Sequence, residues 1–386
     1  MIPTIVVGGI NLIPTLVDFG IATLVYILVA LAVNLEFGYA GVPNFGEVLF
    51  VASGGLIGGS LSYYAMIDVL GLKSTNLLFD QFRFHNIMDN ALIAHPYLDL
   101  ALFLFMIAAG ASVGALFGFL ASYPAIRLRE DYLGMLLLAA GEFFLIFVQS
   151  YTPITDGTSG LNIPDILGFT SSTLDYREVV LLGILAVATV LVFLYAERIA
   201  RSPLGRTLRA VRDNDMSSAS LGKNNIAIRR NILIVGSALS GIAGVLVVTQ
   251  SAYISPETFT RTFFTFYPFV IVILGGAANN FGVVIGAITF EGIIDVVTNF
   301  QTYASTHNIT IPIDLNAVTP IGIGVLLIVI LYWRPKGLIS EKPSFTLKKS
   351  ELLRLKESAS KSEGIDAQSS ASSNPAEEQT PDKPPP

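Results

Sequence analysis

The side chains in this sequence that could do chemistry are a few acids and amides placed within or beside long apolar stretches. Glu142 lies in the middle of the run LLLAAGEFFLI, with no base beside it. A carboxylate at the centre of a helix in lipid costs about 2.5–3.5 kcal/mol, so we expect Glu142 to face a bundle interior or a water-filled path. Asn44 and the pair Asn279–Asn280 lie where helices are expected to break, and there their amides could meet a polar solute. We therefore take Asn44, Glu142, Asn279 and Asn280 as candidates for a translocation path.

Other kinds of active site find no support in the sequence. The chain has no cysteine, which excludes thiolate catalysis and thiolate metal sites. Its histidines, His85, His95 and His307, are scattered and lack the spacing of metal ligands. The sequence contains no Gly-x-x-x-x-Gly-Lys-Ser/Thr motif, the loop that cradles ATP phosphates in many ATPases. These observations predict a protein that is not an enzyme by itself and that holds no cofactor or metal.

The elements that must position these residues are expected to be membrane-spanning helices. Hydrophobic residues make up 52% of the chain and charged residues 13%, where a soluble protein carries about 25% charge. A span needs roughly 20 mostly apolar residues. Nine segments qualify: 14–33, 45–67, 98–123, 131–150, 178–199, 231–252, 263–279, 281–299 and 318–333. We predict an all-α polytopic membrane protein with about 8–10 transmembrane helices. The sequence leaves open whether 263–279 and 281–299 meet in a tight turn or form a re-entrant element.

The basic residues indicate how these segments cross the membrane. When the segments are threaded through a bilayer, all but four of the 23 Lys and Arg residues fall on one side, and the exceptions are Lys73, Arg83, Arg177 and Arg261. The positive-inside rule then places 198–230 and the C-terminus in the cytoplasm, and the loops 68–97 and 151–177 outside the cell membrane. We divide the chain into a transmembrane domain, 1–340, and a cytoplasmic tail, 341–386, whose polar composition predicts disorder.

A short amphipathic helix is predicted within 202–222. Ser202 is a good N-cap, Pro203 suits the first helical position and Gly222 suits a C-terminal stop. Arg209 and Asp213 are four positions apart and could form an ion pair. The residues alone leave two interpretations open, a helix lying on anionic lipid and a docking helix whose apolar side enters a groove of a cytoplasmic partner. That apolar side of the helical wheel consists of Leu204, Leu208 and Val211.

The segment 202–222, SPLGRTLRAVRDNDMSSASLG, resembles the cytoplasmic coupling segment of the LivM-like permease subunits of branched-chain amino acid ABC transporters. The chain departs from that segment at Asp215 and at Ser217–Ser218, where the family has a glutamate and two alanines. Other stretches resemble the family in the same order, so that the resemblance covers about residues 34–339. These stretches are 34–46, 127–142, 155–161, 274–287 and 333–338.

The resemblance implies a subunit of an ATP-driven importer of branched-chain or related amino acids. Its partners would be a second, LivH-like permease subunit, two cytoplasmic ATPase subunits that bind ATP and Mg²⁺, and an external solute-binding protein. An alternative is a stand-alone secondary carrier that uses Glu142 as a proton or sodium site. A membrane-embedded enzyme would need a cluster of acids or histidines, which the sequence does not suggest. By the resemblance, the ATPase would dock on Leu204, Arg206, Leu208, Arg209, Val211, Arg212, Asp213 and Gly222.

Overall fold

The computed structural model describes residues 6–7, 10–72, 77–128, 130–168 and 174–306, together with 320–322, 324–325, 328–329, 332–334 and 337–341. Contacts between Cα atoms divide the chain into a compact unit, Met1–Glu341, and a second unit, Lys342–Pro386. The predicted tail lies outside the described residues apart from Glu341, and so does much of the predicted span 318–333.

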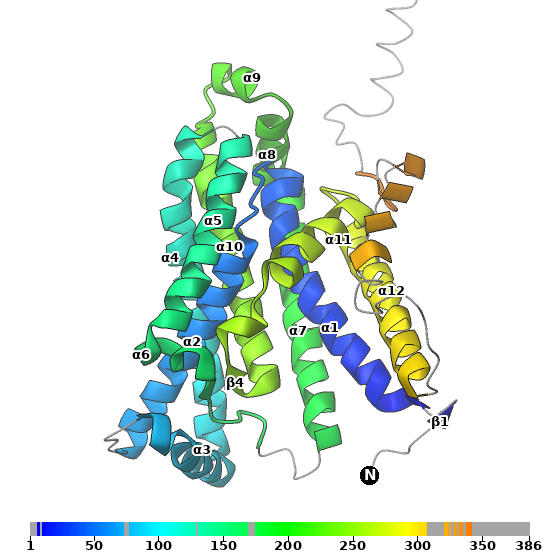
Figure 1. Cartoon of the computed structure of the whole chain (residues 1–386). Helices are drawn as coiled ribbons and strands as arrows, with labels where there is room; N and C mark the ends of the chain where they lie inside the picture. The colour runs from blue at the N-terminus through cyan, green and yellow to red at the C-terminus, as the bar shows by residue number, and fades with distance from the viewer. Residues whose placement is uncertain are drawn as a thin grey trace, which may run out of the picture. The chain divides into compact units, whose positions relative to one another are not determined.

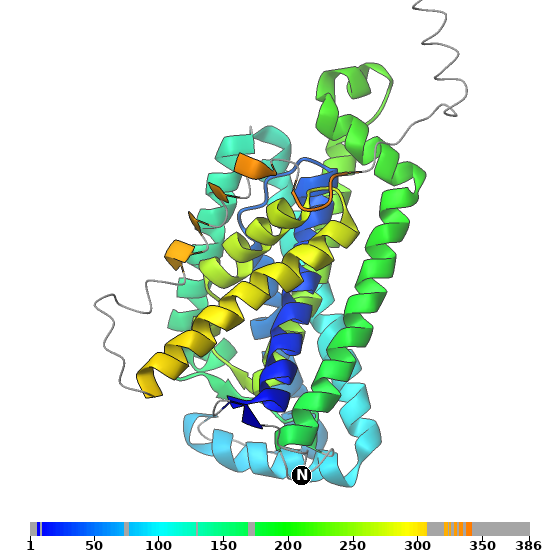
Figure 2. The ribbon, with the colours of Figure 1, turned by 90° about the vertical axis from the view of Figure 1, so that its right-hand side faces the viewer.

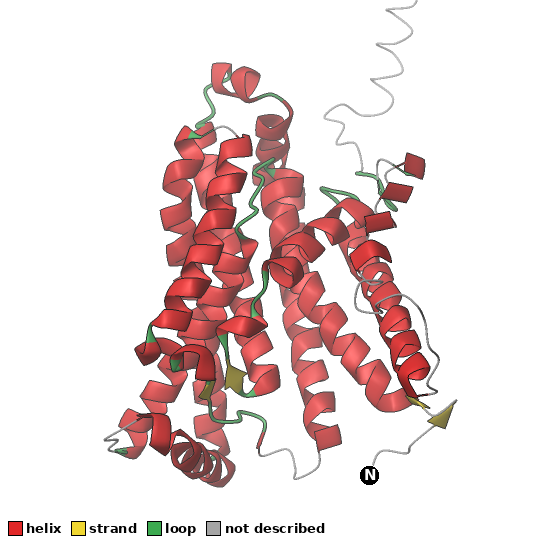
Figure 3. Cartoon of the chain, viewed as in Figure 1, coloured by secondary structure: helices red, strands yellow, loops and turns green. Residues whose placement is uncertain are grey.

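The described chain is built mainly of helices, which confirms the predicted all-α membrane class (Figures 1 and 3). The α-helices are α1 (Leu12–Val33), α2 (Glu47–Leu70), α3 (Leu77–Ala94), α4 (Pro96–Arg127), α5 (Glu130–Ser150), α6 (Thr152–Thr155), α7 (Leu174–Arg201), α8 (Pro203–Asp213), α9 (Asp215–Ser220), α10 (Asn225–Ser251), α11 (Tyr267–Gly275) and α12 (Asn280–Thr306). Two π-helical turns, η1 (Asn34–Tyr39) and η5 (Thr262–Phe266), continue α1 and precede α11, and short 3-10 turns lie at η2 (Gly157–Ser159) and η4 (Pro256–Thr258). Four short strands pair antiparallel, β1 (Val6–Val7) with β2 (Ile10–Asn11) and β3 (Leu161–Asn162) with β4 (Tyr253–Ile254).

Seven helices in the described residues are long and apolar enough to cross a membrane, and each coincides with a predicted span. They are Ile13–Tyr39, Glu47–Leu70, Pro96–Pro124, Asp131–Ser150, Tyr176–Arg201, Asn225–Ser251 and Asn280–Tyr303. The predicted span 263–279 is a shorter apolar helix, Thr262–Gly275. Its C-cap is Gly276, whose φ of +110° favours glycine, and Ala278 also has a positive φ of +60°. α11 and α12 therefore meet in a tight turn, one of the two arrangements that the sequence left open.

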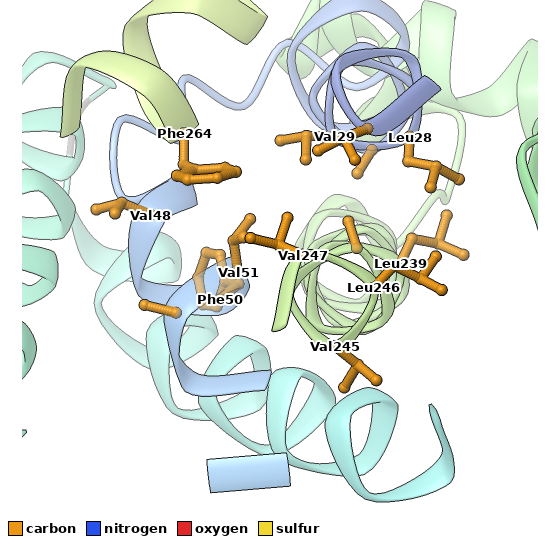
Figure 4. Packing of buried hydrophobic residues seen from close by; sticks show 14 of the residues in the cluster. Leu28, Val29, Val48, Phe50, Val51, Leu239, Val245, Leu246, Val247 and Phe264 are labelled. Atoms are coloured by element: carbon orange, nitrogen blue, oxygen red, sulfur yellow. The ribbon is translucent and has the colours of Figure 1, made fainter. Parts of the chain in front are cut away.

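Helices α2 and α10 form the centre of the bundle. In the most apolar 18-residue stretch of each of these helices, 78% is buried inside the protein. The corresponding share in α7 is 28%, so most of its side chains would face lipid. Figure 4 shows side chains of α2, including Phe50 and Val51, beside those of α10 such as Val247. Glycines allow this close packing, because a Cβ added to Gly114 of α4 would lie 3.1 Å from the Cα atom of Gly241 in α10.

The two ends of the bundle carry different elements. Helices α8 and α9 lie at one end, at the top of Figure 1, and α3 crosses the opposite end (Figures 1 and 2). α3 falls in the segment 68–97, which the sequence analysis treated as an external loop. Its buried side chains Phe84, Met88 and Leu92 recur every fourth residue, which is the spacing of one helix face.

Candidate functional site

A cluster of buried polar side chains lies where α1 gives way to α2. The π-helical turn η1 ends at Tyr39, and the chain then runs without regular structure until α2 begins at Glu47. The Asn44 side-chain amide donates hydrogen bonds to Glu36 Oε2 at 2.6 Å and to Glu47 Oε2 at 2.8 Å. The Asn44 carbonyl oxygen accepts the backbone N–H of Gly46 at 3.2 Å. All three polar side chains have no exposed surface, so a solute would reach this cluster only if the surrounding helices separate.

The same cluster is joined to two further elements of the bundle, α10 and η5. The second oxygen of Glu47 accepts a hydrogen bond from the Ser240 hydroxyl of α10. The backbone N–H of Val48, in the first turn of α2, donates to Thr265 Oγ1 of η5 at 3.0 Å. Glu36 Oε1 finds no hydrogen-bond partner among the described residues. The start of α2 and the turn η5, which leads into α11, thus meet beside the two buried carboxyl groups of Glu36 and Glu47. Asn44, one of the predicted path residues, lies at the centre of this junction.

Asn279 and Asn280 fasten helices to one another at a different place. Asn279 Oδ1 accepts the backbone N–H groups of Phe281 and Gly282 at 3.1 and 3.2 Å, and so caps the start of α12. Asn280 donates to Glu197 Oε2 of α7 at 2.9 Å and accepts a hydrogen bond from the Asn34 amide of η1 at 2.9 Å. These amides bind α1, α7 and α12 together near the α8 end. The structure therefore does not bring the four predicted path residues into one site.

Glu142 has a basic partner that the sequence did not reveal. Its Oε2 atom lies 3.2 Å from Arg261 Nε, and the side chains are 40% and 47% exposed. Along the sequence no base lies beside Glu142, and the positive-inside rule places Arg261 on the outer face. The placement of Arg261 is wrong, because the chain turns back into the bundle after β4 and carries Arg261 to the middle of α5.

The predicted segment 202–222 forms two helices rather than one. Ser202 caps α8 as expected, with its hydroxyl accepting the Gly205 N–H at 3.4 Å. Asn214 then adopts an extended conformation, and its side chain caps α9 by accepting the Ser217 N–H at 2.9 Å. Gly222 has a φ of +76°, which agrees with the predicted stop.

The apolar face of α8 is turned into the protein. Leu208 and Val211 have no exposed surface, whereas Leu204 is 45% exposed. The docking interpretation places these side chains in a groove of a partner, whereas in the structure Leu208 and Val211 are buried by their own chain. The side chain of Arg206 is exposed.

The arginines on the other side of α8 tie it to the end of η1 and to Glu341. Arg212 donates to the Gly38 carbonyl oxygen at 2.5 Å and to Glu341 Oε2 at 2.9 Å. Burial alone would lower the pKa of Arg212, but the carboxylates of Glu341 and Asp213 raise it above its usual value. Arg209 also lies 3.0 Å from Glu341, and its guanidinium covers the Tyr39 ring at 5.3 Å. In the described chain Asp213 pairs with Arg212 at 3.2 Å, so the predicted Arg209–Asp213 pair is replaced by these contacts.

Exposed apolar side chains at this end include those of α9, the turn after it and the start of α10. Met216 is 83% exposed, Leu221 is 82% exposed and Ile226 is 52% exposed. We call these three residues the α9 tip. Helical-wheel reasoning missed the α9 tip because its members do not share one helical period with the apolar side of α8.

At the opposite end an ionic network joins α3, α7 and α10. Asp89 of α3 accepts the backbone N–H of Asp165 at 2.9 Å, and the Asp165 side chain pairs with Arg177 Nε at 2.8 Å. Arg177 also donates to two carbonyl oxygens at the end of α10, at 2.9 and 3.1 Å. Burial raises the pKa of Asp89, although the Asp165 N–H and nearby His85 partly offset this effect.

A cavity of about 550 Å³ lies between α2, α4 and α5. All of its lining side chains are apolar, among them Leu49, Phe117 and Phe144, so they offer no partner to a charged solute. Among the described residues, no group of three or more acids or histidines could hold a metal ion.

Long apolar helices that enclose hydrogen-bonded carboxyl and amide groups define a multi-pass membrane protein of the transport class. Residues 15–331 match the family described as the permease component of branched-chain amino acid transport systems. This match covers most of the chain, and the chain therefore belongs to that permease family. It confirms the family resemblance that the sequence segments indicated.

Similar proteins of known name agree with this assignment. The chain is 35% identical, over 322 residues, to a probable branched-chain amino acid transport permease protein LivM from Methanocaldococcus jannaschii, with 83% of this chain and 92% of the relative covered. It is 27% identical to the high-affinity branched-chain amino acid transport system permease proteins LivM of Salmonella typhimurium and Escherichia coli. These matches cover 87% and 86% of this chain and 72% of each relative. No solved structure gave a significant match.

Proposed function

We propose that this chain is the membrane-spanning subunit of an ATP-driven importer that carries branched-chain or related amino acids. The family and the names of the relatives support this cargo. The lack of an ATP-binding motif in the sequence supports the assignment of ATP and Mg²⁺ to separate subunits. The inferred assembly contains a LivH-like second permease, two ATPase subunits and an external solute-binding protein. In this assembly the α8–α9 end and the C-terminus face the cytoplasm, and the α3 end faces outward.

The single observation that carries the proposal of ATPase docking is the exposed α9 tip. Met216 and Leu221 are held out from the bundle on a short helix at the end where the sequence concentrates its positive charge. Exposed apolar side chains grouped in this way mark a surface that a partner protein covers. Because Leu208 and Val211 are buried, we place the docking surface on the α9 tip together with the outward side chains Leu204 and Arg206. Gly222 supplies the turn that presents Leu221.

The contacts of α8 supply a route from this docking surface to the bundle centre. A movement of the ATPase that displaces α9 would also displace α8. α8 in turn is bound to the end of η1, because Arg212 donates a hydrogen bond to the Gly38 carbonyl oxygen. The same π-helical turn carries Glu36, which Asn44 joins to the start of α2. Rigid-body movement of packed elements between two arrangements is a common form of conformational switching in proteins. In the proposed mechanism, closure of the ATPase pair shifts η1 and thereby separates the start of α2 from its neighbours.

The test uses the complete transporter with its binding protein in proteoliposomes. Met216→Asp and Leu221→Asp should abolish the ATP hydrolysis that loaded binding protein stimulates, while the permease remains folded and in the membrane. Val69→Asp is the matched control, because Val69 is 64% exposed at the other end of α2 and should leave hydrolysis unchanged. If loaded binding protein still stimulates ATP hydrolysis in both α9 variants, the result would favour the interpretation in which this segment lies on lipid. Uptake by this chain alone, without ATPase subunits, would instead favour the secondary carrier.

A further inference from the structure

The ion pair Glu142–Arg261 lies at a depth where charge is costly. Glu142 is 11 residues beyond Asp131 and 8 before Ser150, the ends of the span that contains it. At a rise of about 1.5 Å per residue, the pair lies about 16 Å from one end and about 12 Å from the other. The side chains are nevertheless 40% and 47% exposed. Charged groups at such depth face a bundle interior or a water-filled path rather than lipid, so this face of the subunit borders a path or a covering partner.

The pair is built from elements that a transport cycle would move. Glu142 belongs to α5, and Arg261 immediately precedes η5, the turn whose Thr265 holds the start of α2. Exposed phenyl rings accompany both charges along the chain, since Phe143 is 71% exposed and Phe263 is 45% exposed. The pair thus offers one carboxylate and one guanidinium that are both partly exposed, with an exposed phenyl ring close to each charge along the chain. The apolar cavity between α2, α4 and α5 offers no such pair of charges.

We propose that Glu142 and Arg261 bind the head group of the transported amino acid, by exchanging their mutual ion pair for contacts with its ammonium and carboxylate groups. This inference rests on the proposed function and names the site within it. A guanidinium binds a carboxylate through two parallel hydrogen bonds, and a carboxylate accepts hydrogen bonds from an ammonium group. The exchange leaves each charge paired before and after binding, which avoids the large cost of an isolated charge away from water. The matching ligand class is a zwitterionic α-amino acid, whose two charged groups complement the carboxylate and the guanidinium.

The test measures uptake of radiolabelled leucine by the assembled transporter carrying Glu142→Gln or Arg261→Gln. Each loses a charge-assisted contact, so uptake should fall about tenfold to hundredfold. Hydrolysis of ATP stimulated by loaded binding protein should continue, and the amount of intact complex and its thermal stability should stay near wild type. Arg201→Gln is the matched control, because it removes the exposed 2.6 Å ion pair with Glu197 at the end of α7 and should leave uptake unchanged.

A double charge reversal separates recognition from a purely structural ion pair. In Glu142→Arg combined with Arg261→Glu, the pair can form again, so a structural role predicts that uptake returns to wild type. Recognition predicts that uptake stays low, because each charged group of leucine would meet its partner in the wrong place. Recovery in the double variant, or wild-type uptake by Arg261→Gln, overturns the inference. Absence of ATP-dependent amino acid uptake by the wild-type transporter would instead overturn the proposed function.

Discussion

Replacement of Leu208 by alanine tests whether α8 is packed against the rest of its own subunit. Leu208 has no exposed surface, and a Leu→Ala change at buried sites costs about 2–5 kcal/mol. Because α8 lies at the end of the bundle, where neighbours can relax, we expect the low end of that range, about 2–3 kcal/mol. Each 1.4 kcal/mol corresponds to a factor of ten in an equilibrium constant, so local opening of α8 should become about 30-fold to 140-fold more frequent.

Hydrogen exchange of the α8 backbone amides, followed by mass spectrometry on the purified subunit, measures this opening directly. Leu204→Ala is the matched control in the same helix, because Leu204 is 45% exposed and should lose less than about 1 kcal/mol. If Leu208 entered a groove of the ATPase, Leu208→Asp would detach or uncouple the ATPase and leave the spans folded. The structure predicts that this variant first detaches α8 from the bundle, because the new aspartate would place a charge at a fully buried position. Equal exchange in Leu208→Ala and Leu204→Ala, in the absence of any partner, would refute the reasoning.

Three further predictions concern packing, the buried acids and pH. Gly55→Ala should lower thermal stability in detergent, because its Cβ would lie 2.7 Å from a carbonyl oxygen of α10 and such overpacking costs about 1–3 kcal/mol. Gly183→Ala, with no described atom within 4 Å of the new Cβ, should be neutral or stabilising. Asn44→Ala removes two hydrogen-bond donors from buried carboxyl groups and should lower the free energy of unfolding by at least about 2 kcal/mol. The loss should appear as a lower midpoint of thermal unfolding. An unchanged midpoint would contradict a stabilising role for these hydrogen bonds. Burial raises the pKa of Asp89, so its contribution to stability is greatest below the unfolded pKa and is lost as pH rises through the folded value. Asp89→Asn should therefore gain stability relative to wild type as pH rises from 4 towards 7, and a difference independent of pH would rule this out.

Much of the fold could be predicted because lipid leaves few choices to the chain. Seven of the nine predicted spans are long apolar helices, as runs of apolar residues must form helices to satisfy their backbone groups. The start of α8 could also be predicted, since Ser202 and Pro203 act locally. α3 was missed although Phe84, Met88 and Leu92 recur every four residues, because its charged residues favoured an external loop.

Contacts between segments far apart in the chain could not be read in this way. A helical wheel places Leu208 and Val211 on one face, but it does not tell whether that face meets a partner, lipid or the same chain. The positive-inside rule sorts charges by the loop that carries them, so it fails where a loop turns back into the bundle. Arg261 is such a case, and its pairing with Glu142 changes the chemistry inferred for both residues. An acid that would need a proton or a sodium ion in lipid is instead one half of a neutral pair. The pair leaves this subunit without an isolated charge at that position, and this favours a carrier whose energy comes from a separate ATPase over one driven by an ion bound at Glu142.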